Sequence, residues 1–509
     1  MQENRHEGRK EIVSSIVYNF LSKIIGFLTT LVVSIKIGTT IELDLYYLVF
    51  GLIGAVCGLI VTQESYFITP RGLLIKSKLG IEAFVKYYNN ILIIYVFIAI
   101  ILSLIFLFLT TPIINGVSKF PIEYIKRTDG LLKLLTVYLC LTPVNTLMGN
   151  ILNSLNYYRV TTIITFVSSI SVMLCLVLLD SLSTTALFIS TGISSLGTLL
   201  SFVIFLKVKG WNFTLRFSKG KIKLSNKLLY ANGMAFLAYF KGMLNNYLVS
   251  GMNKGALTGF TYGYGLHNMP TFLILSQVKI PFSVKISDLF HEKRINELSD
   301  YISRILLILI HLTIPLNLIF FEFSEDIVQL IYGNGKFDSA TLGSISAVFG
   351  NLSFTIPLSV FESFIFQIFI SLNKLKEISK YTLWNNILLL VLNFVGLNWF
   401  GLKGFAISMI IMYILMVLFL IFHIRMTFEF INLKRVFIQY LILLIFSQLL
   451  IELTHFLLKN FNMENQILFL SVNIVIYFIF YILMVYFINF GNIPRSEFVA
   501  FYSKYILKR

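Results

Sequence analysis

The chain has 509 residues, of which 57% are hydrophobic and 13% are charged, and its mean hydropathy is +0.84. A soluble protein of this size cannot bury so large an apolar share, which excludes a water-soluble enzyme or binding protein. The formal net charge of +17 would suit nucleic-acid binding. However, the basic residues alternate between loops, as the positive-inside rule produces in membrane proteins. We therefore expect an integral membrane protein that binds no nucleic acid.

Fourteen apolar runs follow one another along the chain. Each has roughly the 20 residues with which a helix crosses a bilayer. Runs such as "ILIIYVFIAIILSLIFLFL" are apolar all round, which favours helices over the alternating pattern of a β-barrel. The sequence therefore predicts an all-α membrane protein with about 14 transmembrane helices. The predicted spans are 12–37, 44–69, 89–113, 131–155, 158–180, 184–207, 227–252, 256–285, 303–321, 340–372, 378–400, 403–425, 436–458 and 466–490.

The distribution of Lys and Arg predicts how these spans are oriented. When the N-terminus is placed in the cytoplasm, most of the 41 Lys and Arg residues fall on the inside, so we expect both termini to be cytoplasmic. The most basic loop, "KVKGWNFTLRFSKGKIKLSNK", lies near the middle of the chain. We expect it to hold the orientation by attraction to anionic lipid headgroups.

A weak internal repeat suggests how the spans are grouped. The segment "LVVSIKIGTTIELDLYYLVFGL" aligns with "YLVSGMNKGALTGFTYGYGL", and a proline-bearing helix that ends in Ser-Leu-Asn occurs in both halves. Two repeated halves are typical of secondary transporters. We expect an N-terminal six-helix lobe at 1–207 and a C-terminal six-helix lobe at 227–425. A basic cytoplasmic linker at 208–226 would join them, and residues 426–509 would form two additional helices and a cytoplasmic tail.

Ionisable residues inside the apolar runs are the first candidates for function. A charge at mid-helix costs at least about 2.5 to 3.5 kcal/mol, so such residues mark cavities, ion sites or substrate paths. Lys23, Lys241 and Glu362 lie too deep to reach water easily, and we expect them to line a cavity. Lys36 can instead extend to the outer headgroups, and Asp44 suits the N-cap of its own helix.

The candidate site residues fall into two groups. The cations expected to bind an anionic substrate are Lys23, Lys241 and Lys36. The residues expected to couple to ions or to gate the cavity are Asp44, Glu64, Glu362 and His267.

The chain carries no motif for ATP hydrolysis, nucleophilic catalysis or zinc binding. We expect a transporter with no catalytic residues and no metal site. A drug or cation antiporter is one alternative, but its cavity would be dominated by carboxylates. A polytopic glycosyltransferase or polymerase is another, but it would need a sizeable external loop, and the outside loops are short.

Three segments resemble one transporter family. "SKIIGFLTTLVVSIKIGTTIELDLYYLVFGL" is similar to the first two helices of the lipid II flippase (MurJ/MviN) family, within the superfamily of multidrug, oligosaccharidyl-lipid and polysaccharide exporters. "GNILNSLNYYR" resembles its fourth helix and the following turn. "LIYGNGKFDSA" resembles its external segment before helix 10. The chain is therefore identified as a divergent member of that family.

The resemblance implies a bacterial inner-membrane flippase that works as a monomer by alternating access. Its substrate would be an undecaprenyl-pyrophosphate-linked saccharide, moved from the inner to the outer leaflet among membrane lipids. No cofactor is implied, and the energy would come from a Na⁺ or H⁺ gradient or from the membrane potential. The last two helices would provide a groove for the lipid tail.

The family's cavity arginines fall on four positions here, at Lys23, Thr29, Cys57 and Gly265, and only Lys23 keeps the charge. A pyrophosphate needs cationic donors in a cavity of low dielectric, and Cys or Gly cannot replace an Arg fork. The resemblance is therefore compatible with lipid II and also with a capsule, exopolysaccharide or O-antigen repeat unit on the same lipid carrier.

Overall fold

The computed structural model describes residues 2–179, 183–214, 226–372, 374–427, 434–459 and 466–488. Within these ranges the chain is helical and has no β-strand. The helices are α1 (Gln2–Lys36), α2 (Ile41–Gln63), the π-helical turn η1 (Glu64–Ile68), α3 (Thr69–Val117), α4 (Ile122–Ser154), α5 (Tyr158–Leu178), α6 (Thr184–Val208), α7 (Asn226–Val249), α8 (Ala256–His291), α9 (Ile295–Glu322), α10 (Ser324–Tyr332), α11 (Ser339–Ser353), α12 (Thr355–Ser371), α13 (Leu375–Thr427), α14 (Lys434–Lys459) and α15 (Gln466–Ile488).

Every predicted span overlaps a helix, so the all-α membrane fold is confirmed. In the described part, nine helices are long and apolar enough to cross a bilayer on their own, and α11 and α12, which bend by 51° where they meet, satisfy the same criterion as a pair. The 53-residue α13 contains two of the predicted spans. Helices are favoured because their backbone groups bond internally, and hydrocarbon offers no water to replace those bonds.

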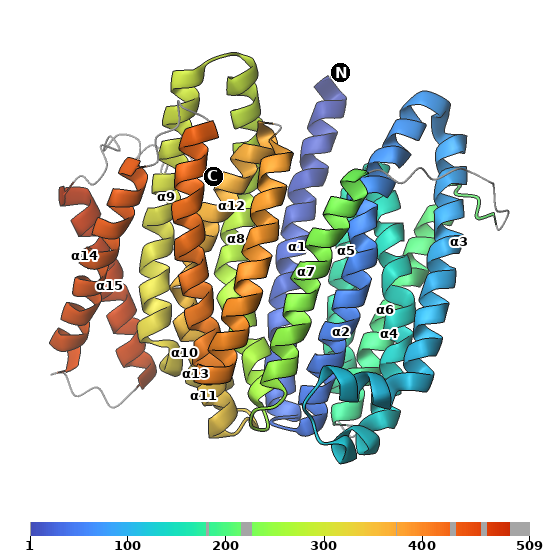
Figure 1. Cartoon of the computed structure of the whole chain (residues 1–509), viewed down its shortest axis with the longest axis horizontal. Helices are drawn as coiled ribbons and strands as arrows, with labels where there is room; N and C mark the ends of the chain where they lie inside the picture. The colour runs from blue at the N-terminus through green and yellow to red at the C-terminus, as the bar shows by residue number, and fades with distance from the viewer. Residues whose placement is uncertain are drawn as a thin grey trace. The chain divides into compact units, whose positions relative to one another are not determined.

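Two glycines interrupt the longest helices. Gly80 in α3 has φ +83°, and Gly401 in α13 has φ +60°. A side chain disfavours this backbone conformation, so each long helix changes direction where no Cβ is present. Figure 1 shows the turn in α3.

The chain packs into two compact units. The first unit contains Met1–Tyr262, Tyr332–Ser344 and Thr382–Gly401, and the second contains Gly263–Ile331, Ile345–Tyr381 and Leu402–Arg509. The predicted lobes at 1–207 and 227–425 stay a prediction.

In the first unit, α4 packs against α2, α3 and α6, and α1 packs against α5 (Figure 1). Its apolar core includes the fully buried side chains of Phe84, Tyr88, Leu147, Ile151 and Leu206. Burial of a side chain of this size contributes about 1.5 to 3 kcal/mol, so this core holds the helices at fixed positions.

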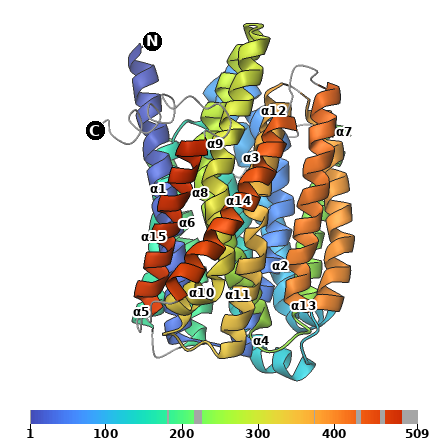
Figure 2. The ribbon, with the colours of Figure 1, turned by 90° about the vertical axis from the view of Figure 1, so that its left-hand side faces the viewer.

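In the second unit, α9 packs against α12, α14 and α15, and α14 packs against α15. Figure 2 shows α14 and α15, in red, beside α9. Many of the outward side chains of these helices are large and apolar, for example Leu449 at 58% exposed and Ile482 at 58%. Such surfaces are compatible with lipid and not with water.

Candidate functional site

Asp44 lies in the first turn of α2 and is fully buried. Its Oδ2 accepts a hydrogen bond from the Gly255 backbone N–H at 2.7 Å. Its Oδ1 accepts from the Thr258 N–H at 2.8 Å and from the Thr258 hydroxyl at 2.6 Å. The carboxylate therefore caps the N-terminus of α8, where free N–H groups and the helix dipole favour negative charge.

The expectation that Asp44 caps its own helix is wrong. The N-cap of α2 is Thr40, whose side chain accepts from the Leu43 N–H at 3.1 Å. The Asp44 side chain is thus available for α8, a different part of the sequence.

A second set of contacts surrounds this carboxylate in the same unit. The Thr39 hydroxyl lies 2.9 Å from the Thr341 hydroxyl and accepts from the Asp338 N–H at 3.0 Å. The backbone of Lys336 bonds to the end of α1, with its N–H 2.8 Å from the carbonyl of Ser34. We call these residues together the Asp44 joint: Ser34, Thr39, Asp44, Gly255, Thr258, Lys336, Asp338 and Thr341.

Glycine is required at the centre of the Asp44 joint. Gly255 has φ +82°, and a Cβ there would lie 2.1 Å from Oγ1 of Thr341 and 2.9 Å from Cγ2 of Thr39. The joint therefore brings α2, the start of α8 and the start of α11 together without room for a larger residue.

Asp338 is the member of the Asp44 joint that directly precedes α11. Partial burial raises the pKa of this carboxyl, but hydrogen bonds with Thr341 and Thr39 outweigh it and hold the pKa below its ordinary value. The Thr341 N–H donates to Oδ1 of Asp338 at 2.8 Å. Asp338 thus stays ionised and caps α11, just before the membrane-spanning segment begins.

Tyrosines extend the joint toward α1. The Tyr47 hydroxyl donates to the Tyr262 hydroxyl at 3.0 Å, and Tyr262 donates to the carbonyl of Thr30 at 3.4 Å. The Thr30 hydroxyl lies 3.1 Å from the hydroxyl of Tyr332. These bonds are neutral and individually contribute only about 1 kcal/mol, so they can break and re-form.

Lys241 is half-buried on α7, and its Nζ donates to Oδ1 of Asn386 at 3.1 Å. One turn along α7, Oδ1 of Asn245 accepts from Nδ2 of Asn393 at 3.1 Å. The two pairs form a polar row between α7 and the first half of α13, both in the first unit.

The other two lysines differ in exposure. The Lys23 side chain is exposed, although it lies in the middle of α1. Lys36 is half-buried in the last turn of α1, where a cation is favoured by the helix dipole. Its carbonyl accepts from Nζ of Lys336 at 3.1 Å.

Glu64 is the first residue of η1 and is fully buried. Its Oε2 accepts a hydrogen bond from Nδ2 of Asn150 on α4. π-helical turns often occur at functional sites, because they release a backbone bond and redirect a side chain.

The remaining two candidates lie in the second unit. The Tyr381 hydroxyl donates to Oε1 of Glu362 at 2.7 Å. Nε2 of His267 lies 3.2 Å from the hydroxyl of Thr355, the first residue of α12, at the bend that follows α11.

The structure therefore places the seven candidates in several separate contact sets. Asp44 contacts the start of α8, Lys241 contacts Asn386, and Glu64 contacts Asn150. Sequence reasoning missed all of these partners because they are uncharged. Asn is uncommon in hydrocarbon, however, and an Asn within an apolar run is a signal that could have found Asn150, Asn386 and Asn393.

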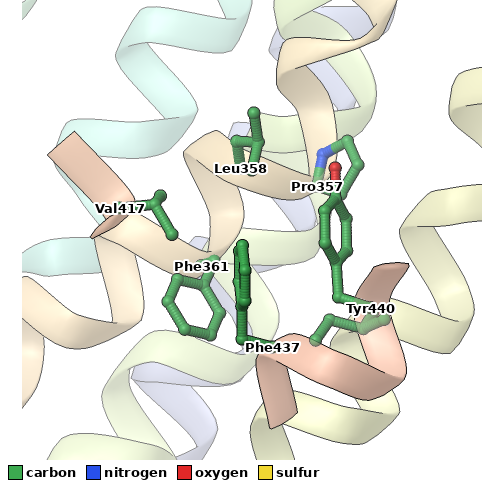
Figure 3. A pocket seen from close by; sticks show the side chains of 7 residues that line it. Pro357, Leu358, Phe361, Val417, Phe437 and Tyr440 are labelled. Atoms are coloured by element: carbon green, nitrogen blue, oxygen red, sulfur yellow. The ribbon is translucent and has the colours of Figure 1, made fainter. Parts of the chain in front are cut away.

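The second unit also contains a small apolar pocket between α9, α12, α13 and α14 (Figure 3). Tyr440 and Phe437 come from α14, one of the two additional helices. The lining residues are Ile310, Pro357, Leu358, Phe361, Val417, Phe437 and Tyr440. Such a lining suits hydrocarbon and offers little to an ion.

A metal centre finds no support in the described part of the chain. No group of three or more His, Cys, Asp or Glu side chains comes together there. The three cysteines, Cys57, Cys140 and Cys175, are free.

Comparison with known proteins places this arrangement in a class. A solved structure, "Lipid II flippase MurJ, inward closed conformation", matches with a TM-score of 0.75 and 17% identity, over 94% of this chain and 99% of that one. An inward-facing multidrug transporter of the MATE family matches with a TM-score of 0.60 and 15% identity, over 81% of this chain and 94% of that one. The fold is therefore that of the MurJ and MATE membrane transporters.

The sequence comparisons narrow the class to one family. The family model described as "Lipid II flippase MurJ" matches residues 38–477. The probable lipid II flippase MurJ of Rhizobium tropici is 22% identical over 358 residues, which cover 65% of this chain and only 65% of that relative's length. The chain belongs to the lipid II flippase MurJ family, a family of multi-pass membrane transporters in peptidoglycan biosynthesis, which are not catalytic enzymes.

Proposed function

We propose that this protein moves an undecaprenyl-pyrophosphate-linked saccharide from the inner to the outer leaflet of the bacterial inner membrane by alternating access. The observation that carries the proposal is the family match over residues 38–477, which includes the whole Asp44 joint except Ser34. A carrier must close one end of its path while the other end is open. The Asp44 joint supplies a closed contact built from reversible hydrogen bonds.

The cations Lys23, Lys241 and Lys36 are proposed to receive the pyrophosphate. Lys241 supports this role because it lies in the middle of α7, and its Nζ already donates to a side-chain oxygen, that of Asn386 at 3.1 Å. An ammonium that donates to a phosphate forms a charge-assisted hydrogen bond, which contributes about 1.5 to 3 kcal/mol.

The lipid tail is proposed to remain in hydrocarbon along α14 and α15. The apolar pocket supports this role, because α14 contributes Phe437 and Tyr440 to its lining (Figure 3). Both termini are proposed to face the cytoplasm, and the protein is proposed to act as a monomer. Energy is proposed to come from a Na⁺ or H⁺ gradient or the membrane potential, with Asp44, Glu64, Glu362 and His267 as candidates for coupling or gating.

The identity of the saccharide is the finer part of the proposal. The positions that resemble the family's arginines carry Thr29, Cys57 and Gly265. This departure favours neither lipid II nor another lipid-linked repeat unit, so both substrates belong in the test.

The test is a leaflet-accessibility assay in proteoliposomes with fluorescent lipid II and, separately, a lipid-linked capsule repeat unit. The wild-type protein is expected to expose at least one substrate in the opposite leaflet. Lys23→Ala and Lys241→Ala are expected to slow the transfer by about tenfold, the effect of losing one charged hydrogen bond. The matched control is Lys133→Ala, since Lys133 pairs with Asp129 at 2.6 Å and is expected to be dispensable. Equal transfer rates in all three variants would show that Lys23 and Lys241 do not bind the substrate during transfer.

A further inference from the structure

The carboxyl of Glu64 has an unusual surrounding for an acidic group. It is fully buried, and its Oε2 accepts from the side-chain amide of Asn150. Its Oε1 is buried as well and accepts no hydrogen bond from any described residue. An ionised carboxylate has acceptor sites on both oxygens, and leaving one of them empty in a protein interior is costly.

Among the described residues, the groups that face Glu64 supply no compensating positive charge. On α3, the Tyr95 and Tyr88 phenols face it; the Tyr95 phenol shares a hydrogen bond with the carboxyl, and its hydroxyl donates to the Ile60 carbonyl at 3.3 Å. On α4, Asn150 and Ser154 are uncharged.

The basic residues nearby have other contacts. Nζ of Lys76 donates to the carbonyl of Ser154 at 3.1 Å, and Arg71 lies over the ring of Phe67. On α7, Tyr239 packs toward Gly58 and Lys241 donates to Asn386. No ion pair involves Glu64 within the described ranges.

A metal cation is a poor match for this place. Hard cations take six or more oxygen ligands. The hydrogen-bond partners of Glu64 among the described residues are the Asn150 amide and the Tyr95 phenol, and a cation would displace the amide N–H. A proton suits the site better, because the neutral acid requires no counter-charge and its O–H can donate to the hydroxyl oxygen of Tyr95.

We propose that Glu64 is a proton-binding site of the first unit, and that the carboxyl carries its proton on Oε1 in the conformation described here. The proton is taken from water by the carboxylate and returned to water, with no other reactant. Release requires the carboxylate to reach water or a cation. Glu64 is the first residue of η1, so a rearrangement of that π-helical turn would expose its side chain. The coupling of this proton to transport rests on the proposed flippase function, but the binding of the proton does not.

The direct test is infrared difference spectroscopy of the full chain in nanodiscs, titrated from acidic to alkaline pH. A protonated carboxyl has a carbonyl-stretch band that shifts in heavy water. The wild type is expected to keep such a band at neutral pH and to lose it at alkaline pH. Glu64→Gln is expected to lack the band, and Glu82→Gln, which changes an exposed carboxylate in α3, is expected to keep it.

Two results would overturn the proposal. One is a band at neutral pH that survives Glu64→Gln, because the proton would then lie elsewhere. The other is the absence of any such band in the wild type at neutral pH, because the carboxyl would then be ionised; a sodium-induced spectral change that Glu64→Gln abolishes would further show that the carboxylate binds sodium instead. Neither readout requires a substrate, so failure here is distinguishable from failure of the flippase assay.

A separate experiment tests whether proton binding at Glu64 is coupled to substrate transfer. If the protein flips a substrate, a proton gradient is expected to change the rate for the wild type and for Glu82→Gln, but not for Glu64→Gln. A Glu64→Gln protein that folds, flips and responds to the gradient as the wild type does would remove Glu64 from coupling.

Discussion

At the scale of single residues, Asp44 and Glu64 show how the same functional group acquires two roles from its surroundings. Asp44 accepts three hydrogen bonds at the start of α8, so both of its oxygens are occupied. Glu64 has one amide donor and one unoccupied oxygen. The first carboxyl therefore suits a structural contact and the second suits a proton.

The contribution of Asp44 to stability can be tested by a substitution that keeps the shape of its side chain. Asp44→Asn removes the charge and turns one acceptor oxygen into a donor that faces the N–H groups of α8. We expect a loss of about 2 kcal/mol in the free energy of unfolding, the effect of a charge-assisted contact. Thermal unfolding in detergent measures this change. The matched control is Glu42→Gln in the same helical turn. An equal loss of unfolding free energy in the two variants would show that the contact between Asp44 and α8 does not stabilise the protein.

At the scale of helices, length and apolarity predicted a helix at each of the fourteen positions, because the bilayer imposes both properties on any helix that crosses it. The same two properties contain no signal for η1 or for the short α10, which the sequence analysis missed. They also contain no signal for the partners of Asp44, since Gly255 and Thr258 are 211 and 214 residues away. Charged residues were found as candidates, but their neutral partners depend on packing that single-sequence patterns do not encode.

The close approach of helices at Gly255 predicts that a larger residue there destabilises the protein. Gly255→Ala would place a Cβ 2.1 Å from Oγ1 of Thr341 in a backbone conformation with φ +82°. We expect destabilisation by about 2 to 4 kcal/mol, from backbone strain of roughly 1 kcal/mol and the displacement of α11. Chemical denaturation measures it.

Gly130→Ala is the control for that substitution. Gly130 lies within α4, and nothing lies within 4 Å of the Cβ that would be added. Alanine there is expected to stabilise the protein by about 0.5 to 1 kcal/mol, since it favours the helix. Similar effects of the two substitutions would mean that the Asp44 joint tolerates a wider spacing.

At the scale of the whole molecule, the predicted orientation in the membrane follows from the positions of the basic loops. Glu82 lies in a predicted inside segment and Glu123 at a predicted outside end, and both are exposed. In a variant without the three native cysteines, Glu123→Cys is expected to react with an impermeant thiol reagent added to intact spheroplasts. Glu82→Cys is expected to react only after lysis. The reverse pattern would invert the topology and the proposed direction of transfer.

The central claim is that a lipid-linked saccharide crosses only if the Asp44 joint opens. Thr39 and Thr341 face each other there, with their hydroxyl oxygens 2.9 Å apart, so two cysteines at these positions are close enough for a disulfide. The decisive measurement is the flipping rate of Thr39→Cys/Thr341→Cys, in the background without native cysteines, before and after reduction. We predict that the oxidised protein does not transfer substrate and that reduction restores transfer. Full-rate transfer by the cross-linked protein would contradict the account.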